Sequence, residues 1–482
     1  MLWLQSTTRP NPEERGVYTG PKIEWEGSGR RRFALDFSAG RVSSDGGGLL
    51  LRQADDRIGL SRRLAACFRD YRKPEYIDHT AAELIAQRIH GLAIGYEDLN
   101  DHEELSKDPL LAAQVGKADP TGQTRLQSRG QPLASPSTLG RLERTKADAT
   151  AASRYEKIVV DFDALEDLFL TLFIEQYEGR EPSRIVIDLD PSDIELHGQQ
   201  EQRVYHGYYR NHGYLPMYAY CGEYPLSVEL RPANIDGAAG ATALFARIVT
   251  KLRAVWPSTH IILRADSGFC RDDLLTYCEE TEDVDYVIGV AKNERLKKAL
   301  APAMKRAHRD HLRTGDAARH FAELRYRTLK TWSRARRVVG KAEHLAKGEN
   351  PRFVVTSLPA REFEKRYLYA DLYCARGEME NRIKEQQLDL FGDRASCHTF
   401  RGNHIRSWFS MAAQWLIVTV RTIGLEGTEL ARAQAGTIRT KLFKVGAIVA
   451  VSVRRIYVRL SSAFPRQRLF CRALARLAAP SG

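Results

Sequence analysis

The chain has 482 residues, of which 43% are hydrophobic, and a formal charge of +12 at pH 7. This length suits two or three domains with a sizeable core, and the positive charge favours a polyanionic partner. The seven cysteines include no Cys-x-x-Cys pair, which argues against a structural zinc site. The sequence shows neither the apolar core of a signal peptide nor an apolar stretch long enough to span a bilayer. We therefore expect a cytoplasmic protein.

Residues 1–150 are expected to form a mainly α-helical region that binds DNA or mediates dimerisation. Apolar residues recur every three or four positions over 55–68 and 80–94, and a Ser or Thr in the stretch from Ser135 to Thr138 caps a further helix. Short helices with interleaved arginines suit DNA recognition, but small helical domains also form simply by packing. Both interpretations stay open at this stage.

Residues 151–295 alternate between helical and strand-like patterns. The expected elements are a helix over 155–178, strands over 185–190, 215–221 and 226–231, a helix over 239–255, a strand over 261–266, a helix from 271 and a strand over 286–290. This order is typical of the first part of a ribonuclease H-like core. We therefore predict an α/β protein with a ribonuclease H-like catalytic core.

The remaining residues are divided into two further segments. Residues 296–365 are rich in arginine and aromatic residues with strand-like pieces, and we interpret them as a β-rich insertion domain. Residues 366–482 complete the core with a late helix and end in a basic C-terminal region. No internal repeats are present.

Two strands end in acidic residues. Asp188 and Asp190 share one face of their strand because side chains alternate with a period of two, and Asp190 lies at the strand exit. Asp266 is followed by Ser-Gly, which favours a tight turn with exposed oxygens. An isolated aspartate at a strand end is often only structural, so the prediction rests on its combination with Glu380 on the late helix.

The late helix presents Tyr373, Arg376 and Glu380 on one face, at spacings of three and four residues. A carboxylate, a fixed cation and a phenol suit a phosphate held beside a metal ion. Together with the two strand-end aspartates, Glu380 can hold a pair of divalent cations that clamp the attacking and leaving oxygens of a phosphodiester. Oxygen ligands favour Mg²⁺ or Mn²⁺ over zinc. The pattern indicates an enzyme that cuts and joins DNA.

Basic residues cluster in two segments. Residues 305–341 contain twelve Lys or Arg against three acids, and residues 431–482 contain eleven and no acid. A solvated charged surface is the simpler interpretation of one such run, but two runs around a group of carboxylates favour DNA. We therefore expect Arg334, Arg336 and Arg337 to contact DNA. No phosphate-binding Gly-x-x-x-x-Gly-Lys loop is present, so no nucleotide cofactor is expected.

At these residues the chain resembles the bacterial insertion-sequence transposases of the Asp-Asp-Glu type, in the group with the signature Tyr, two residues, Arg, three residues, Glu, six residues, Lys. The quoted stretches begin at Ser44 (Ser-Asp-Gly-Gly), Gly95 (Gly-Tyr-Glu-Asp-Leu-Asn-Asp), His197 (His-Gly-Gln-Gln), Arg264 (Arg-Ala-Asp-Ser-Gly-Phe) and Glu380 (Glu-Asn-Arg-Ile-Lys-Glu).

The resemblance implies that Asp190, Asp266 and Glu380 are catalytic and bind two Mg²⁺ (or Mn²⁺) ions per active site. It also implies cut-and-paste transposition in the bacterial cytoplasm, with a hairpin intermediate in some relatives. The expected partners are double-stranded DNA, as terminal inverted repeats and as target, and a second copy of the chain in a homodimer.

The chain departs from the family pattern at two positions. Asp190-Pro191-Ser192 stands where the family typically has Asp, any residue, Thr, and Gln387 occupies the signature lysine position. Lys384, one turn after Glu380, is predicted to supply the missing cation to DNA. Two alternatives remain open: a transposase-derived DNA-binding protein that no longer cuts, and a stand-alone metal-dependent DNA nuclease.

Overall fold

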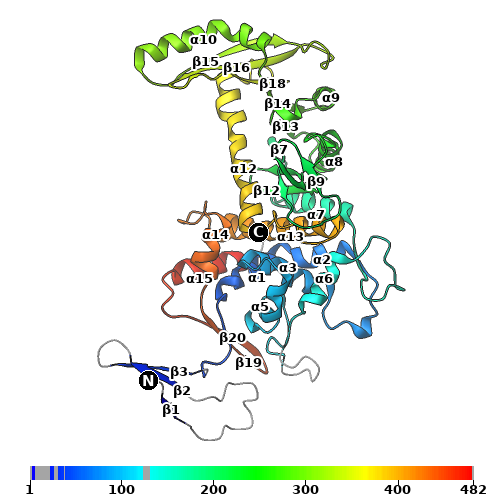
Figure 1. The fold of residues 1–482 in the computed structure, drawn as a ribbon, viewed down its shortest axis with the longest axis vertical. Coiled ribbons are helices and arrows are strands. Elements are labelled where there is room, and N and C mark those ends of the chain that lie inside the picture. The colour runs from blue at the N-terminus through cyan, green and yellow to red at the C-terminus, as the bar shows by residue number, and fades with distance from the viewer. Residues whose placement is uncertain (1–2, 6–21, 27–30, 37, 123–130, 480–482) are drawn as a thin grey trace.

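The computed structural model describes residues 3–5, 22–26, 31–36, 38–122 and 131–479. The molecule is elongated, with a large sheet in the upper half of Figure 1 and a layer of helices in the lower half. The long helical segment drawn in yellow joins the two halves.

The sheet is mixed and has nine strands, which bears out the α/β class. Its main path runs in the order β12-β11-β7-β13-β14-β18-β16-β15. The strands that match those expected from sequence are β7 (Arg184–Pro191), β11 (Met217–Cys221), β12 (Tyr224–Glu229), β13 (His260–Ala265) and β14 (Val284–Val290). Strand β13 runs parallel to β7 and β14, whereas β11 runs antiparallel to β7 and β12.

The segment expected as an insertion domain, 296–365, continues this sheet. It contains most of α10 (Glu294–Thr314) and the strands β15 (Ala318–Tyr326), β16 (Arg336–Leu345), β17 (Gly348–Glu349) and β18 (Arg352–Thr356). Strand β18 pairs antiparallel with β14, from Val287↔Thr356 to Val290↔Phe353. The segment expected as an insertion domain is thus joined to the central sheet, because backbone hydrogen bonds run on from β14 into β18.

Helices cover both faces of the sheet (Figure 1). One face carries α8 (Ala241–Arg253) and α9 (Asp272–Glu280). The other face carries residues 365–389, which we call the glutamate helix: α11 (Lys365–Tyr367), η5 (Leu368–Tyr373), η6 (Cys374–Arg376), α12 (Gly377–Lys384) and η7 (Glu385–Asp389). Ile261 and Leu263 pack in the main core, whereas the intervening Ile262 packs with Leu368 and Leu372 of the glutamate helix. This alternation follows from the two-residue period of a strand.

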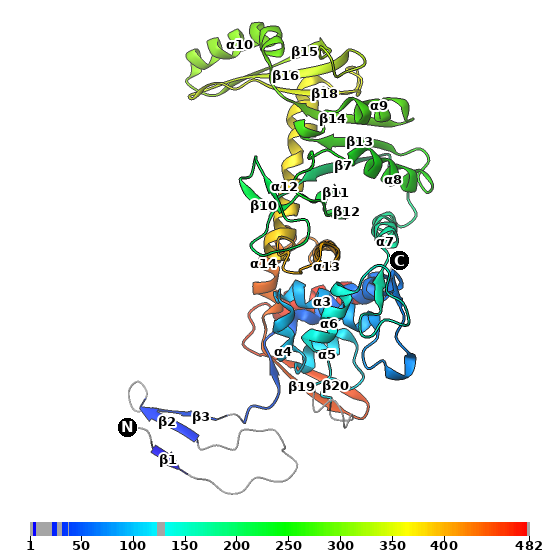
Figure 2. The ribbon, with the colours of Figure 1, turned by 45° about the vertical axis from the view of Figure 1, so that its right-hand side comes forward.

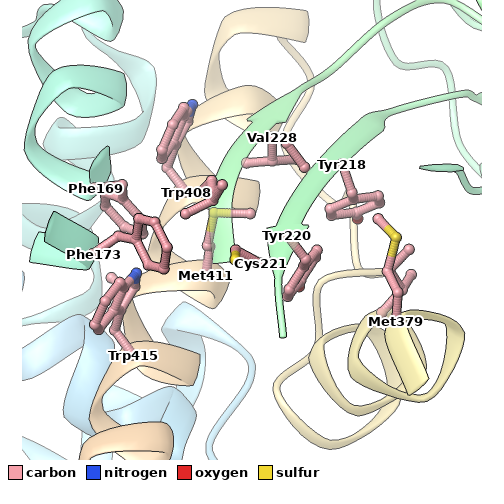
Figure 3. Close-up of a cluster of buried hydrophobic side chains, with 14 of the residues drawn as sticks. Phe169, Phe173, Tyr218, Tyr220, Cys221, Val228, Met379, Trp408, Met411 and Trp415 are labelled. Atoms are coloured by element: carbon pink, nitrogen blue, oxygen red, sulfur yellow. The ribbon is translucent and has the colours of Figure 1, made fainter. Parts of the chain in front are cut away.

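Helix α13 (Phe400–Thr419) lies buried between the sheet and the helical layer. Figure 3 shows Trp408, Met411 and Trp415 of this helix between the aromatic residues of α7 (Phe162–Glu175) and the strands of the sheet. The Trp415 indole donates a hydrogen bond to the Pro225 carbonyl at 3.0 Å. Residues 407–420 are all buried, as expected of a helix at the centre of a large core.

The lower layer contains the N-terminal helices: α1 (Leu49–Ile58), α2 (Leu60–Ala66), α3 (Ala81–Ile94), α4 (His102–Leu105), α5 (Pro109–Val115) and α6 (Pro136–Arg144). Thr80 and Glu83 form a reciprocal capping box at the start of α3. Arg88 of α3 forms a buried ion pair of 3.1 Å with Glu143 of α6. Among the described residues, no helix combines the length and apolar character that crossing a bilayer requires.

The basic C-terminal region returns to this layer. Strand β19 (Ala447–Ser452) pairs with β20 (Arg455–Leu460) and with β4 (Val42–Ser43), and α15 (Gln467–Ala478) packs beside α1. Further small elements include β1 (Trp3–Gln5), β2 (Lys22–Glu26), β3 (Arg32–Leu35), β5 (Phe68–Asp70), β6 (Ile158–Val160) and α14 (Ala435–Ile438). The N-terminal helices and the described part of the basic C-terminal region thus build one layer together.

Candidate active site

Asp190 and Asp266 lie at the same edge of the sheet. Asp190 is the penultimate residue of β7, and Asp266 directly follows β13. The two strands are parallel and paired up to Leu189↔Ala265, so their carboxyl ends adjoin. Asp266 caps the turn that follows it and accepts a hydrogen bond from the Gly268 amide at 2.8 Å. This arrangement follows from a short Asp-Ser-Gly turn after a buried strand.

Arg376 joins Asp190 to Glu380. Its guanidinium donates to Asp190 Oδ1 at 3.3 Å and to Glu380 Oε1, which lies one helical turn further along the glutamate helix. The three side chains come from a strand and a helix that are 186 residues apart in sequence. The structure therefore brings Asp190, Arg376 and Glu380 into direct contact.

The surrounding charges influence the ionisation of Asp190. Burial, together with the negative charges of Asp266, Glu380 and Asp188, raises the pKa of Asp190 to about 7 against the opposing effect of Arg376. Burial lowers the pKa of Arg376, but the surrounding carboxylates outweigh it, so that the pKa is raised overall. The site thus concentrates more negative charge than one arginine neutralises.

Tyr373 lies beside the Asp266 turn. A Cβ atom placed on Gly289 of β14 would come within 2.6 Å of the Tyr373 hydroxyl oxygen and 2.9 Å of the Ser267 amide nitrogen. Gly289 therefore leaves the space in which the Tyr373 phenol approaches the turn. Sequence analysis missed this glycine, which stands inside an apolar strand without any local turn signal.

Asp188 forms a buried ion pair beneath the site. Arg264 of β13 donates to both Asp188 oxygens, at 2.6 and 2.7 Å, and to the Leu372 carbonyl of the glutamate helix at 2.6 Å. Asp188 is only 2% exposed. Since both of its oxygens are occupied by Arg264, Asp188 holds together the elements that carry the acids rather than standing in for Asp190.

The end of the glutamate helix is fixed by a second buried network. Arg421 pairs with Glu385 at 2.8 Å and with Glu223 at 2.9 Å, and the Ala435 amide donates to Glu385 at 2.7 Å. Both Arg421 and Glu385 have fully buried side chains. Helix α13 adds a further contact, from the Gln414 amide to the Arg382 carbonyl at 2.9 Å. None of these partners was identified from the sequence.

The N-terminal stretches quoted above also support this helix. Tyr96 donates to Asp45 at 2.8 Å, and Lys444 pairs with Asp45 at 2.6 Å. Arg439 donates to the Ala93 carbonyl at 3.1 Å and to the Asp389 carbonyl at the end of the glutamate helix. The Ser44 and Gly95 stretches therefore contact each other, and Arg439 joins the lower layer to the end of the glutamate helix.

Comparison with known proteins places the chain in a family. The model of the family described as transposase DDE domain, group 1, matches residues 26–481. The chain belongs to this family. No curated protein sequence matches it. Among solved structures, it is similar to the piggyBac transposase in a cryo-EM structure of a synaptic complex with hairpin DNA, with 11% identity, a TM-score of 0.40, and 84% of this chain and 80% of that chain covered.

The donor set of this transposase domain has the chemistry of a divalent-cation site. Among the residues that the structure describes, no three His, Cys, Asp or Glu side chains lie close enough together to hold a metal ion as they stand. Arg376 contacts two of the three carboxylates. Carboxylate oxygens suit Mg²⁺ or Mn²⁺, and the raised pKa of Asp190 reports negative charge that a cation would stabilise.

The two departures from the family pattern meet in space. Ser192 donates to Gln387 Oε1 at 3.2 Å, and the Gln387 amide donates to the Asp193 carbonyl at 3.4 Å. Gln387 thus connects the glutamate helix to the loop after Asp190. Lys384 is exposed, and it forms no hydrogen bond or ion pair within the described part of the chain.

The three arginines expected to bind DNA have protein partners. Arg336 is 3% exposed and pairs with Asp272 and Glu279 of α9 at 2.6 Å each. Arg337 pairs with Glu323 at 2.7 Å, and Arg334 pairs with Glu279 at 3.3 Å. The prediction is corrected for Arg336, whose guanidinium is enclosed by carboxylates of the neighbouring helix. Only Arg334, with its side chain 51% exposed, keeps a largely accessible surface.

Proposed function

We propose that this protein is a DDE transposase that cleaves DNA and transfers strands at the ends of an insertion sequence by a cut-and-paste route. The observation that carries the proposal is the meeting of Asp190, Arg376 and Glu380, next to the Asp266 turn, at one edge of the sheet. Membership of the transposase family gives independent support.

The strand order supports a ribonuclease H-like core for this site. The first five core strands lie in the order β12-β11-β7-β13-β14, so the first strand of the core is central, and β11 beside it is antiparallel to both of its neighbours. Asp190 ends the first of these strands and Asp266 ends the fourth. This is the arrangement expected from the sequence for a two-ion nuclease site.

In this proposal Asp190, Asp266 and Glu380 hold two Mg²⁺ or Mn²⁺ ions. When bound, the ions supply Lewis-acid stabilisation of the attacking and leaving oxygens. The Arg376 guanidinium would then bind a phosphate of the DNA in place of the carboxylates, since a guanidinium can bind either a carboxylate or a phosphate through two parallel hydrogen bonds. The phenol of Tyr373 lies next to the Asp266 turn, in the space that Gly289 leaves because it has no side chain.

The remaining assignments belong to the same proposal. Residues 1–150 bind DNA or mediate dimerisation, 151–295 and 366–482 form the core, and 296–365 extends it. The partners are double-stranded DNA, as terminal inverted repeats and target, and a second copy in a homodimer. The protein acts in the bacterial cytoplasm without a nucleotide cofactor.

The test uses the purified chain and a linear DNA fragment that includes the sequences flanking its reading frame. We expect strand cleavage at the repeat ends with Mg²⁺ or Mn²⁺ and none with EDTA. Binding of the ends without cleavage in either metal would instead support the DNA-binding alternative. Cleavage at positions unrelated to the repeat ends would support the stand-alone nuclease.

DNA affinity is expected to depend on exposed cations of α10. Lys298, Lys305 and Arg309 are exposed and recur at spacings that place them on one helix face. Changing all three to glutamine should make the slope of log affinity against log salt concentration less steep by about two to three, because each phosphate contact contributes about 0.9 to that slope. The measurement is fluorescence anisotropy across a salt series.

The matched control for this experiment exchanges Lys for Arg and Arg for Lys at the same three positions, which should keep the slope. Arg336→Gln is expected to lower stability instead, since it leaves Asp272 and Glu279 without their partner. An unchanged slope in the glutamine variant would place the DNA on another surface.

Lys384 is expected to contribute more to strand transfer than Gln387. Its ammonium is exposed one turn after Glu380, whereas Gln387 makes neutral hydrogen bonds to Ser192 and Asp193. A charge-assisted phosphate contact stabilises by roughly 1.5–3 kcal/mol, so Lys384→Ala should slow strand transfer about tenfold or more. Lys384→Arg should preserve the rate, and Gln387→Ala should have a smaller effect. Equal, near-wild-type rates for both alanine variants would contradict this role.

A further inference from the structure

The basic C-terminal region forms a two-stranded ribbon at the far side of the lower layer. The ribbon consists of β19 and β20, which pair over their full lengths and are joined by a turn at Val453 and Arg454. Strand β4 pairs only with the first two residues of β19, and β20 is an edge strand in the described part of the chain. Figure 2 shows the ribbon at the lower edge of the lower layer, away from the large sheet.

The base of the ribbon is attached to the lower layer through one face. Ala447 and Val449 are buried and form a small core with Leu110 of α5. Val458 and Leu460, which lie opposite them on β20, pack against the same core. Since successive side chains of a strand point to opposite faces, the residues between these positions point away from the layer. The ribbon is therefore fixed at its base with one face free.

The free face combines apolar and basic side chains. Ile448 is 44% exposed and lies opposite Arg459, and Tyr457 is 42% exposed on the same face. Arg455 and Arg459 are also exposed, and neither guanidinium forms a hydrogen bond or ion pair within the described residues. Large apolar side chains gathered on one exposed face commonly mark a binding surface.

The charge of the ribbon favours a polyanion as the partner. Arg454, Arg455 and Arg459 are its only charged residues, and no acid occurs in the sequence after Glu429. Charge on an edge strand can protect it from pairing with another sheet, but exposed apolar residues between the charges give no such protection.

The dimensions of the free face match a groove of duplex DNA. Arg455 and Arg459 are four residues apart on one strand, a distance of about 13 Å. The major groove is about 12 Å wide and admits a two-stranded β-ribbon. Two arginines at this separation can therefore contact phosphates on both sides of the groove while the side chains between them face the base edges.

We propose that the β19–β20 ribbon lies in the major groove of the terminal-repeat duplex, with its free face toward the base edges and with Arg455 and Arg459 on phosphates at the two sides. This inference rests on the proposed function. The strands that carry the acids belong to the sheet in the upper half of Figure 1, whereas the ribbon lies at the lower end. The ribbon therefore contacts an internal segment of the repeat, separate from the cleaved end.

The experiment compares wild type with Arg455→Gln/Arg459→Gln. The matched control is Arg468→Gln/Arg472→Gln on α15, which removes the same charge from two exposed arginines that are also four positions apart. Binding to an end duplex is measured by fluorescence anisotropy across a salt series. Protection from dimethyl sulfate is mapped on the same duplex, because this reagent methylates guanine N7 in the major groove and adenine N3 in the minor groove.

We expect the ribbon variant to bind the end duplex about tenfold more weakly, because two charge-assisted phosphate contacts are lost. The slope of log affinity against log salt concentration should become less steep by about two, at about 0.9 for each contact. Protection of guanine N7 should disappear from one internal block of the repeat and persist near the cleaved end. The α15 variant should keep the internal protection and most of the affinity.

Three results would contradict the ribbon's role. These are a ribbon variant that binds and protects the duplex as wild type does, equal losses in both double variants, and internal protection that falls on adenine N3 in place of guanine N7. A changed mass of the free ribbon variant, measured by light scattering, would instead make the ribbon an interface between copies and would also overturn the inference.

The inference and the proposed function fail separately. If wild type cleaves the repeat ends but the footprint does not depend on Arg455 and Arg459, the ribbon's role is wrong and the transposase proposal stands. If wild type binds the ends without cleaving them, the proposed function is wrong, and the footprint of the ribbon variant still decides whether the ribbon lies in the groove.

Discussion

Asp190→Ala, Asp266→Ala and Glu380→Ala are each expected to abolish metal-dependent DNA cleavage while end binding persists. The three carboxylates lie where two strand ends meet the glutamate helix, and the proposal makes them the only ligands that hold the ions. Ion stabilisation of the transition state amounts to several kcal/mol, so each rate should fall by at least about a hundredfold. The measurement is single-turnover cleavage of end DNA, with binding followed separately by anisotropy.

Glu378→Ala is the matched control, because Glu378 is an exposed acid on the same helix, two residues from Glu380. It should cleave at near wild-type rate. A variant of Asp190, Asp266 or Glu380 that retains the wild-type rate would remove that residue from the catalytic set. Asp188 would not be the replacement for Asp190, because Arg264 already occupies both of its oxygens.

Arg264→Leu is expected to destabilise the protein by about 3–5 kcal/mol, the cost of leaving one member of a buried ion pair without its partner. Asp188, at 2% exposure, would lose the partner that opposes the burial-driven rise of its pKa, and the Leu372 carbonyl would lose its donor. The glutamate helix would then lose its main polar connection to β13, so cleavage should fall as well. The measurements are urea denaturation followed by tryptophan fluorescence, and the cleavage rate.

The double variant Asp188→Leu/Arg264→Leu should recover much of the lost stability, since no buried charge remains unpaired. The surface control is Arg180→Leu, which breaks an exposed ion pair with Glu178 and should change stability by less than about 1 kcal/mol. Similar losses for Arg264→Leu and Arg180→Leu would show that the buried pair has no special structural role.

Local patterns in the sequence were enough to place the elements that carry the acids. The apolar run ending at Asp190 forms β7, and the run ending at Asp266 forms β13, because strand formation and burial follow from the nearby side chains. The spacing of four between Arg376 and Glu380 likewise places both on one helix face, where they form an ion pair.

The clustering of basic residues was less reliable for predicting which side chains are free to contact DNA. Arg336 belongs to a strongly basic run, yet its guanidinium is buried against Asp272 and Glu279, which lie more than 50 residues earlier in the chain. The count of basic residues in a segment does not report which acids the fold brings next to them. The same limit applies to residues 296–365, whose joining to β14 depends on strand pairing between distant segments.

The sequence by itself therefore determined the mixed α/β class, the strands that end in Asp190 and Asp266, and the helix that carries Glu380. These features depend on the spacing of apolar and polar residues that are close together in the chain. The tertiary structure decided which polar side chains meet. Asp188 pairs with Arg264 across 76 residues, and Ser192 bonds Gln387 across 195. Such contacts leave no local pattern, since they arise only when the topology of the sheet brings distant strands and helices within hydrogen-bonding distance.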